Sequence, residues 1–257
     1  MYIHPVFHVP HDGAAFPPEL MHSVCVPREQ FLRYHEKMRD RCVLQIVPQR
    51  FRGPDHLAFF PVSRLLCDVE RFIGSQEIME RYGMGFCYER AYDGRRIKEA
   101  SAELLEQTRV YYDRHHRLLD DLCRRHENVL LVDVHSFYAD IVPAAFLETG
   151  RDLPDVCIGA NPAYSDPDLI DTAEEVFRQA GFSTAVNYPY SGCMVPNCVL
   201  SGAYEGRFSC VMLEFNKSVY CDKDEQPSSD RLTLLRSLVE QIVAETDARE
   251  RQKKSPA

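Results

Sequence analysis

Asn128-Val129-Leu130-Leu131-Val132-Asp133-Val134-His135-Ser136-Phe137 is an apolar run that ends in an acid, a histidine and a hydroxyl group. Because the run lacks polar alternation, it is typical of a strand that is covered on both faces. In open α/β sheets, ligands bind at the carboxyl ends of such strands. The stretch therefore predicts an α/β fold with His135 at the functional edge of the sheet.

Two other segments have the same form. Val6 to Gly13 is apolar and carries His11, and Val211 to Asn216 is apolar and carries Glu214. Histidines and carboxylates that arrive from separate strand ends are typical of catalytic zinc, which takes about three N/O ligands and keeps one place for water. A strand-end histidine is also a common hydrogen-bonded structural residue, so the assignment depends on its context.

Length and composition favour one large domain. The chain has 257 residues, of which 45% are hydrophobic, and no linker interrupts it, so we expect a single metallohydrolase domain over residues 1–248. The charged tail, residues 249–257, is predicted to be disordered. The net charge of −9 argues against nucleic-acid binding, because phosphate contacts draw on clustered Lys and Arg.

The amino terminus and the cysteines indicate a cytoplasmic protein. The chain has no apolar run of about 20 residues and no basic segment followed by an apolar core, so we expect neither a membrane span nor a secretory signal. Several of the ten cysteines lie in apolar or helical runs, where reduced thiols serve as small hydrophobes. No CxxC pair occurs, which argues against a cysteine-based structural zinc site.

Strand and helix patterns alternate along the chain. We expect further strands at residues 2–9, 43–47, 155–159 and 184–186, and a strand-like segment at 59–72. Helices are expected at about 28–41, 98–126, 166–180, and from Ser228 or Ser229 to about 248. Pro167 and Gly181 suit the start and the end of the third helix. His115 falls on the buried stripe of the predicted helix 98–126, where we interpret it as a core residue.

Two further stretches carry candidate binding groups. Arg64 and Arg71 interrupt the apolar segment 59–72. An internal salt bridge accounts for one of them, whereas a second guanidinium suits a substrate carboxylate. Asn187 and Tyr190 lie in a loop after a predicted strand, where function concentrates, although the same residues are plain turn formers.

Together these pieces resemble the N-formylglutamate amidohydrolase family, which is related in fold to the zinc carboxypeptidases. The matching pieces occur in the family's order over roughly residues 5 to 220: Val9 to Gly13, Tyr34 to Asp40, Ser63-Arg64, Asp68 to Phe72, Gly83 to Gly85, Tyr111 to His116, Asp133 to Ser136, Asn187 to Gly192 and Glu214 to Asn216. The resemblance implies a three-layer α/β/α fold with a central mixed sheet. It also implies a metal-dependent hydrolase of N-acylated acidic amino acids, with N-formyl-L-glutamate as substrate, as in histidine degradation.

The resemblance implies a role for each candidate residue. Zn²⁺ or another divalent transition metal would be held by His11, His135 and Glu36. Alternatively, His35 would complete the site in place of Glu36. Glu214 would act as general base and acid, and Asp133 would either orient His135 or serve a structural role. Substrate contacts would come from Arg64, Arg71, Asn187 and Tyr190.

Two departures from the family pattern are visible. His35-Glu36 stands where the family has Thr-Asp, so the carboxylate is longer. Lys217 stands where the family has Arg, which keeps the charge but loses the bidentate fork. Two other functions stay open: a thiol amidase that uses Cys193 with a nearby histidine, and a related fold retained as a binding protein.

Overall fold

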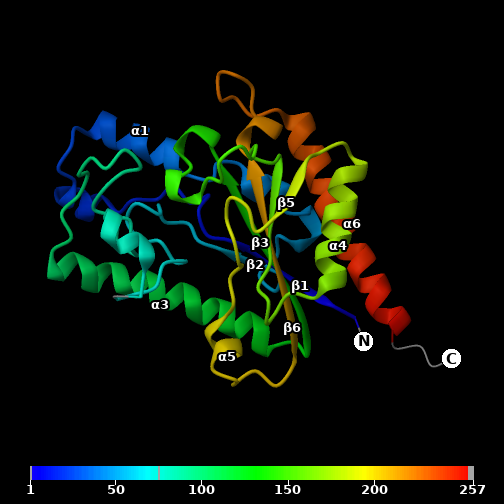
Figure 1. The fold of residues 1–257 in the computed structure, drawn as a ribbon. Coiled ribbons are helices and arrows are strands. Elements are labelled where there is room, and N and C mark those ends of the chain that lie inside the picture. Colours follow the sequence, from blue (N-terminus) through cyan, green and yellow to red (C-terminus); the bar gives the residue numbers. More distant parts are fainter. Residues whose placement is uncertain (1, 75, 254–257) are drawn as a thin grey trace. The chain divides into compact units, whose positions relative to one another are not determined.

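A computed structural model describes residues 2–74 and 76–253 of the chain (Figure 1). The chain divides into two compact units. One, called here the sheet unit, comprises Met1–Val9, Cys42–Ala58 and Asp120–Ala257; the other, called the insert unit, comprises Pro10–Arg41 and Phe59–Leu119. Among the described residues, no helix combines the length and the apolar character that crossing a bilayer requires.

The sheet unit is built on a mixed six-stranded sheet in the order β2-β1-β3-β6-β4-β5. β1 pairs with β3 in parallel, β3 with β6 in parallel, and β4 with β5 in parallel, whereas β4 runs antiparallel to β6. The strands are β1 (His4–Val9), β2 (Leu57–Phe59), β3 (Asn128–Phe137), β4 (Val156–Gly159), β5 (Thr184–Val186) and β6 (Arg207–Asn216). Every residue of β3 is buried, as its apolar sequence predicts.

Helices pack around this sheet. α4 (Pro167–Gln179) lies against β4, β5 and the carboxyl-terminal helix α6 (Ser229–Lys253), and Figure 1 shows α4 and α6 side by side. Asp166 caps α4 by accepting a hydrogen bond from the Asp168 amide, and Gly181 follows it with φ of +89°. α2 (Val43–Ile46) packs on β3 and α6, and α5 (Asn197–Leu200) is a single turn. The predicted three-layer α/β class is confirmed.

Two predicted strands are wrong. In the predicted strand 43–47, residues Val43–Ile46 form the short helix α2, because Val43 and Ile46, three residues apart, bury one helical face. A short apolar run does not distinguish a strand from a helix. In segment 59–72 only Phe59 belongs to a strand. The Ser63 carbonyl accepts hydrogen bonds from the amides of Leu66 and Cys67, which turns the chain instead of extending it.

Helix α6 is longer than predicted. It continues through Arg249, the predicted start of the tail, to Lys253. Near its end the Lys253 ammonium lies 2.7 Å from Asp168, and Arg251 pairs with Asp247 one turn earlier, so the last turn carries favourable charge pairs. The remainder of the predicted tail, residues 254–257, lies outside the described residues.

The insert unit holds α1 (Arg28–Met38) and most of α3 (Ala102–Arg124), both shorter than predicted. One of its cores packs Phe31 and Tyr34 of α1 against Leu65 and Ile97. At the start of the unit, the backbone passes so close to the Phe60 carbonyl that a Cβ at Gly13 would lie 2.3 Å from its oxygen. A residue without a side chain is therefore needed directly after His11 and Asp12.

Three stacked imidazoles occupy one end of the sheet unit. The His4 ring lies 3.3 Å from that of His126 and 4.2 Å from that of His56, at interplanar angles of 11° and 15°. Burial lowers the pKa of both His4 and His126, and the neighbouring rings lower it further, against the opposing effect of Asp55. The folded protein thus favours neutral imidazoles at this position.

We expect the stack to make stability depend on pH. Unfolded imidazoles bind protons near pH 6.5, and these folded ones bind them only at lower pH, so the unfolded state takes up more protons as the pH falls. The free energy of unfolding should therefore be retained above about pH 7 and decline below about pH 6.5. Denaturant titrations at several pH values measure this free energy. In His126→Phe, which keeps an aromatic ring, it should decline less steeply as the pH falls. His22→Phe, at an exposed hydrogen-bonding site, should decline as the unchanged protein does.

Candidate active site

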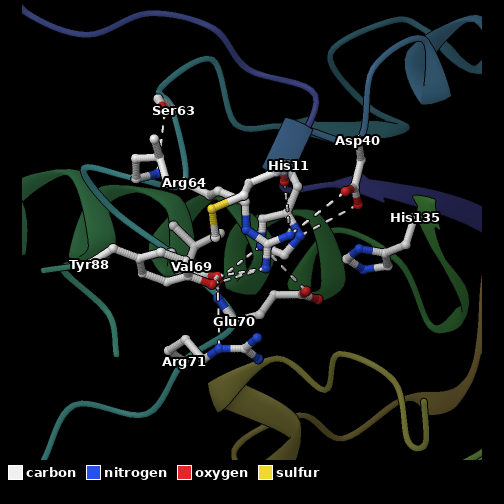
Figure 2. A network of polar contacts seen from close by, with 12 residues as sticks. His11, Asp40, Ser63, Arg64, Val69, Glu70, Arg71, Tyr88 and His135 are labelled. Atoms are coloured by element: carbon white, nitrogen blue, oxygen red, sulfur yellow. Dashed lines mark hydrogen bonds and ion pairs between the residues drawn. The ribbon is translucent and has the colours of Figure 1, made fainter. Parts of the chain in front are cut away.

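Asp68 is the centre of a buried polar network in the insert unit. Figure 2 shows the labelled residues of this network, among them His11, Arg64 and Tyr88. The Asp68 carboxylate accepts hydrogen bonds from His11 Nε2 at 2.9 Å, Arg64 Nη2 at 2.9 Å, and the Tyr88 hydroxyl at 2.8 Å. The Glu70 amide donates a fourth at 3.1 Å. Burial raises the pKa of Asp68, but His11 and Arg64 outweigh it and hold the pKa well below its usual range. Asp68 is therefore an ionised anchor for the groups around it.

His11 is positioned by this anchor. Because a carboxylate only accepts hydrogen bonds, the contact with Asp68 places the ring proton on Nε2. Nδ1 then lies 3.6 Å from Asp40 Oδ2, and the Asp40 amide donates to the His11 carbonyl at 3.0 Å. Burial and Arg64 lower the pKa of His11, whereas Asp68 and Asp40 raise it, and the net pKa is above its ordinary value.

On the Nδ1 side of His11 the neighbouring acid is Asp40, whereas the predicted ligand Glu36 has other contacts. Glu36 is half exposed on α1 and lies 3.6 Å from Arg39 Nη1 and 3.6 Å from His35 Nε2. His35, the other candidate, is buried with Nδ1 2.9 Å from the Ser63 hydroxyl, and burial lowers its pKa. Asp40 follows α1 and is 3% exposed. The sequence motif includes it, but its spacing from His11 gave no sign that the two meet.

The two candidate arginines differ in their surroundings. Arg64 is held by Asp68 and by the Tyr88 hydroxyl at 3.3 Å, and its Nη1 lies 3.7 Å from Asp40. Arg71 has a looser contact, with Nε 3.8 Å from Asp68, and its side chain is 26% exposed. Arg64 thus fills the internal salt-bridge role, and Arg71 keeps the more accessible guanidinium.

In the sheet unit, Asp133 accepts hydrogen bonds from the surrounding groups, as Asp68 does in the insert unit. It accepts hydrogen bonds from His8 Nδ1 at 2.8 Å, His135 Nε2 at 3.0 Å and the Met194 amide at 3.0 Å. Burial raises the pKa of Asp133, but His135 and His8 hold it well below its usual range. By the same reasoning the His135 proton lies on Nε2, which leaves Nδ1 as the nitrogen with a lone pair.

Glu214 lies beside His135. The two residues are paired in register on the parallel strands β3 and β6, so their side chains leave the same face of the sheet. Glu214 is 7% exposed, and Cys157 is its partner on β4. Burial and the neighbouring Glu214 raise the pKa of Cys157 to about 12. The Glu214 carboxylate is therefore buried and lies close to the edge where β3 and β6 end.

The predicted substrate contacts of the sheet unit lie in its loops. Asn187, with φ of +55°, uses its side-chain oxygen to accept hydrogen bonds from the amides of Ala160 and Gly192, so it shapes its own loop. The Tyr190 ring packs edge to face against Phe137 and Phe146.

Lys217, predicted to stand where the family has an arginine, is 2% exposed, with its ammonium 4.0 Å above the Tyr138 ring. The positive charge is thus retained and packed on an aromatic face.

The alternative thiol site has no imidazole beside it. Within residues 2–74 and 76–253, the polar contacts of the Cys193 sulfur are to the sulfur of Cys210 at 2.6 Å and to the hydroxyl of Ser165 at 3.9 Å. Neither is a general base. No observation therefore favours the cysteine-dependent amidase.

The donors of both units suit a divalent transition metal. Histidine and aspartate side chains able to hold an ion occur in each unit. In each, an imidazole gives Nε2–H to a buried aspartate, which is the outer arrangement typical of metal-bound histidine. The 3.6 Å between His11 Nδ1 and Asp40 Oδ2 is close to the roughly 3.4 Å expected for two ligands of one tetrahedral zinc with bonds of about 2.0–2.1 Å.

Sequence reasoning missed three acids: Asp40, Asp68 and Glu70, the last with an oxygen 3.7 Å from His11 Nε2. The available signal was the Asp68-Val69-Glu70 pattern directly before Arg71, where two acids alternate with one apolar residue. It indicated charge pairing but not the partner.

Comparison with known proteins supports the fold and the family. The family model described as N-formylglutamate amidohydrolase matches residues 3–221. The crystal structure of N-formylglutamate amidohydrolase from Ralstonia eutropha JMP134 matches 97% of this chain and 95% of that one, with a TM-score of 0.73 and 19% identity, a likeness of fold. A second structure, YNDL-apo (zinc-free), covers 46% of this chain and 54% of that one at 12% identity, and its TM-score of 0.30 is too low to compare folds. No curated protein matches the chain.

Proposed function

The chain belongs to the N-formylglutamate amidohydrolase family, and we propose that it hydrolyses N-formyl-L-glutamate to formate and L-glutamate. The family places it among hydrolases that act on an amide. The observation that supports the proposal is the register of His135 with Glu214, which sets an imidazole and a carboxylate side by side near a strand end. Amide hydrolysis needs both an activated water and a proton carrier.

We propose His11, His135 and Asp40 as the metal ligands. Asp40 takes the place predicted for Glu36, because it lies beside His11 while the half-exposed Glu36 contacts Arg39. A bound divalent metal would polarise the amide carbonyl and lower the pKa of water to about 7. Asp68 and Asp133 would hold the two imidazoles in the tautomer that presents Nδ1.

Glu214 would move the proton. As a buried carboxylate it would accept a proton from the attacking water and return it to the leaving nitrogen, so that glutamate departs as an amine. Because β3 and β6 are central strands, His135 and Glu214 are fixed relative to each other, and proton transfer needs no rearrangement of either backbone.

Substrate selection would depend on Arg71 more than on Arg64. The Arg64 guanidinium is held by Asp68 and Tyr88, whereas Arg71 is partly exposed and loosely paired, so it would receive the substrate's side-chain carboxylate. Asn187 and Tyr190 would add contacts from the loop after β5, with Asn187 limited to its amide nitrogen because its oxygen holds the loop.

The experiment that tests the function combines metal analysis with chelation. Purified protein should contain a divalent metal, and dialysis against a chelator should abolish formate release from N-formyl-L-glutamate. Added Zn²⁺, Mn²⁺ or Co²⁺ should restore it. Turnover that survives complete metal removal would refute the metal dependence, and absence of turnover on N-formyl, N-acetyl and N-succinyl glutamate by the loaded protein would refute the function.

We expect Arg71→Lys to weaken selection for acidic substrates. Lysine keeps the charge but loses the two-pronged hydrogen bond, so KM for N-formyl-L-glutamate should rise by about 10–100-fold if that bond contributes about 1.5–3 kcal/mol. A neutral N-formyl amino acid has one carboxylate fewer and serves as the control, with little change expected. Steady-state kinetics on both substrates decide the matter: equal losses would mean that Arg71 supports the fold or acts on the shared carbonyl.

A further inference from the structure

Two cysteines of the sheet unit are in unusually close contact. The sulfur atoms of Cys193 and Cys210 lie 2.6 Å apart, nearer than van der Waals contact between two unbonded sulfurs and only about half an ångström beyond a disulfide bond of about 2.05 Å. Both are free thiols in this structure. The proposed function uses neither of them.

The surroundings of the pair favour an exchange reaction at one of the two sulfurs. Cys210 is fully buried on β6, in register with Leu131 of β3, whereas Cys193 lies in a loop and is partly exposed. The Ser165 hydroxyl, which donates to the Cys210 carbonyl at 2.7 Å, lies 3.9 Å from each sulfur. Cys193 is therefore the sulfur that a reagent from solvent can reach, and Cys210 is the sulfur placed to attack it next.

The loop that carries Cys193 also supports Asp133. The amide of Met194, the next residue, donates to Asp133 Oδ2 at 3.0 Å, and Asp133 holds both His8 and His135. At its other end the loop is held by Asn187, whose oxygen accepts from the amides of Ala160 and Gly192. The Met194 amide, next to Cys193, thus holds this part of the loop on the buried Asp133 carboxylate.

We propose that Cys193 and Cys210 are a reversible disulfide site that fixes residues 187–194 onto β6. With a low-molecular-weight disulfide as oxidant, the Cys193 thiolate attacks one of its sulfurs and expels one thiolate. The Cys210 thiol then attacks the Cys193 sulfur, loses its proton and expels the second thiolate. The protons lost by Cys193 and Cys210 pass through solvent to the two expelled thiolates, which leave as thiols. The two cysteines are oxidised by two electrons, and one small disulfide is reduced to two thiols.

Tryptic mapping tests the bond directly. Trypsin cleaves after Arg178, Arg207 and Lys217, and no Lys or Arg lies between these points, so Cys193 and Cys210 fall in the separate peptides 179–207 and 208–217. After treatment of the full chain with oxidised glutathione, we expect these peptides to be joined, with the loss of two hydrogen masses, and to separate again in a thiol reductant. If no joined peptide forms with excess oxidant, the site is refuted.

The chain supplies a matched control within the same peptide. Cys198 also lies in 179–207, but its sulfur is buried and contacts the Asp120 carbonyl. Cys198→Ser should therefore keep the joined peptide, and Cys193→Ser should abolish it. The opposite pattern would assign the bond to Cys198 and overturn the proposal.

Two physical readouts test the effect on the loop. A bond that closes a chain segment of this length should raise Tm by about 6–12 °C relative to the reduced protein, and this difference should vanish in Cys193→Ser. Hydrogen exchange at the Met194 amide should be slower in the oxidised form, because the bond holds that amide on Asp133. Joined peptides without either change would show that the disulfide forms but does not fix the loop.

Discussion

Replacement of Glu214 by glutamine is expected to lower kcat on N-formyl-L-glutamate by about 10²–10⁴-fold, the usual contribution of a general acid–base group. Glutamine keeps the shape of the side chain but neither accepts nor returns a proton at neutral pH. Because Glu214 is proposed as the proton carrier and not as a ligand, the variant should keep its metal and a nearly unchanged KM. Steady-state kinetics with metal analysis measure all three quantities.

A matched control for this change is Glu250→Gln. Glu250 is also a buried carboxylate of the sheet unit, but it lies on α6 and pairs with Arg207 at 2.9 Å, outside the proposed active site. The Glu250→Gln variant should have a lower free energy of unfolding and an unchanged kcat. If Glu214→Gln instead loses its metal, Glu214 is a ligand, and the roles of Glu214 and Asp40 must be exchanged.

The second large effect is expected at the imidazoles. His135→Ala should lose most of its bound metal, and turnover with it. Loss of a group that is hydrogen-bonded to a metal ligand lowers metal affinity by roughly 10–100-fold, and loss of the ligand itself should lower it more. The fold should persist, since His135 contributes little apolar area compared with the core residues of the same strand, such as Val132 and Val134. His11→Ala should behave in the same way. Metal content per folded protein, with circular dichroism as a check of folding, measures the effect.

His115→Ala separates loss of a ligand from loss of a buried histidine. His115 is 4% exposed in α3 and packs edge to face on Phe60, so its removal disturbs a core and should leave metal binding intact. Normal metal content in both His135→Ala and His11→Ala would contradict the proposed ligand set. Loss in the His115 variant alone would place the metal elsewhere.

The comparison of sequence and structure shows where local patterns suffice. Asn128–Phe137 was predicted as a buried strand because ten residues without polar alternation have no other stable place than a sheet interior. The same reasoning failed at residues 43–47, which are too short for periodicity to separate a strand from the helical turn that α2 forms. Segment 59–72 failed for a related reason, since its backbone is turned by hydrogen bonds to Ser63.

The sequence by itself determined the α/β class, the central strand with Asp133 and His135, and the resemblance that identifies the family, since these depend on residue order and on which residues are apolar. Only the tertiary structure decided that Asp68, 57 residues away in the chain, binds the His11 imidazole. The same holds for the position of Asp40, rather than Glu36, beside His11 Nδ1. It also holds for the contact of Cys193 with Cys210. These contacts join segments far apart in the chain. Their partners depend on strand register and loop packing, which no local spacing encodes.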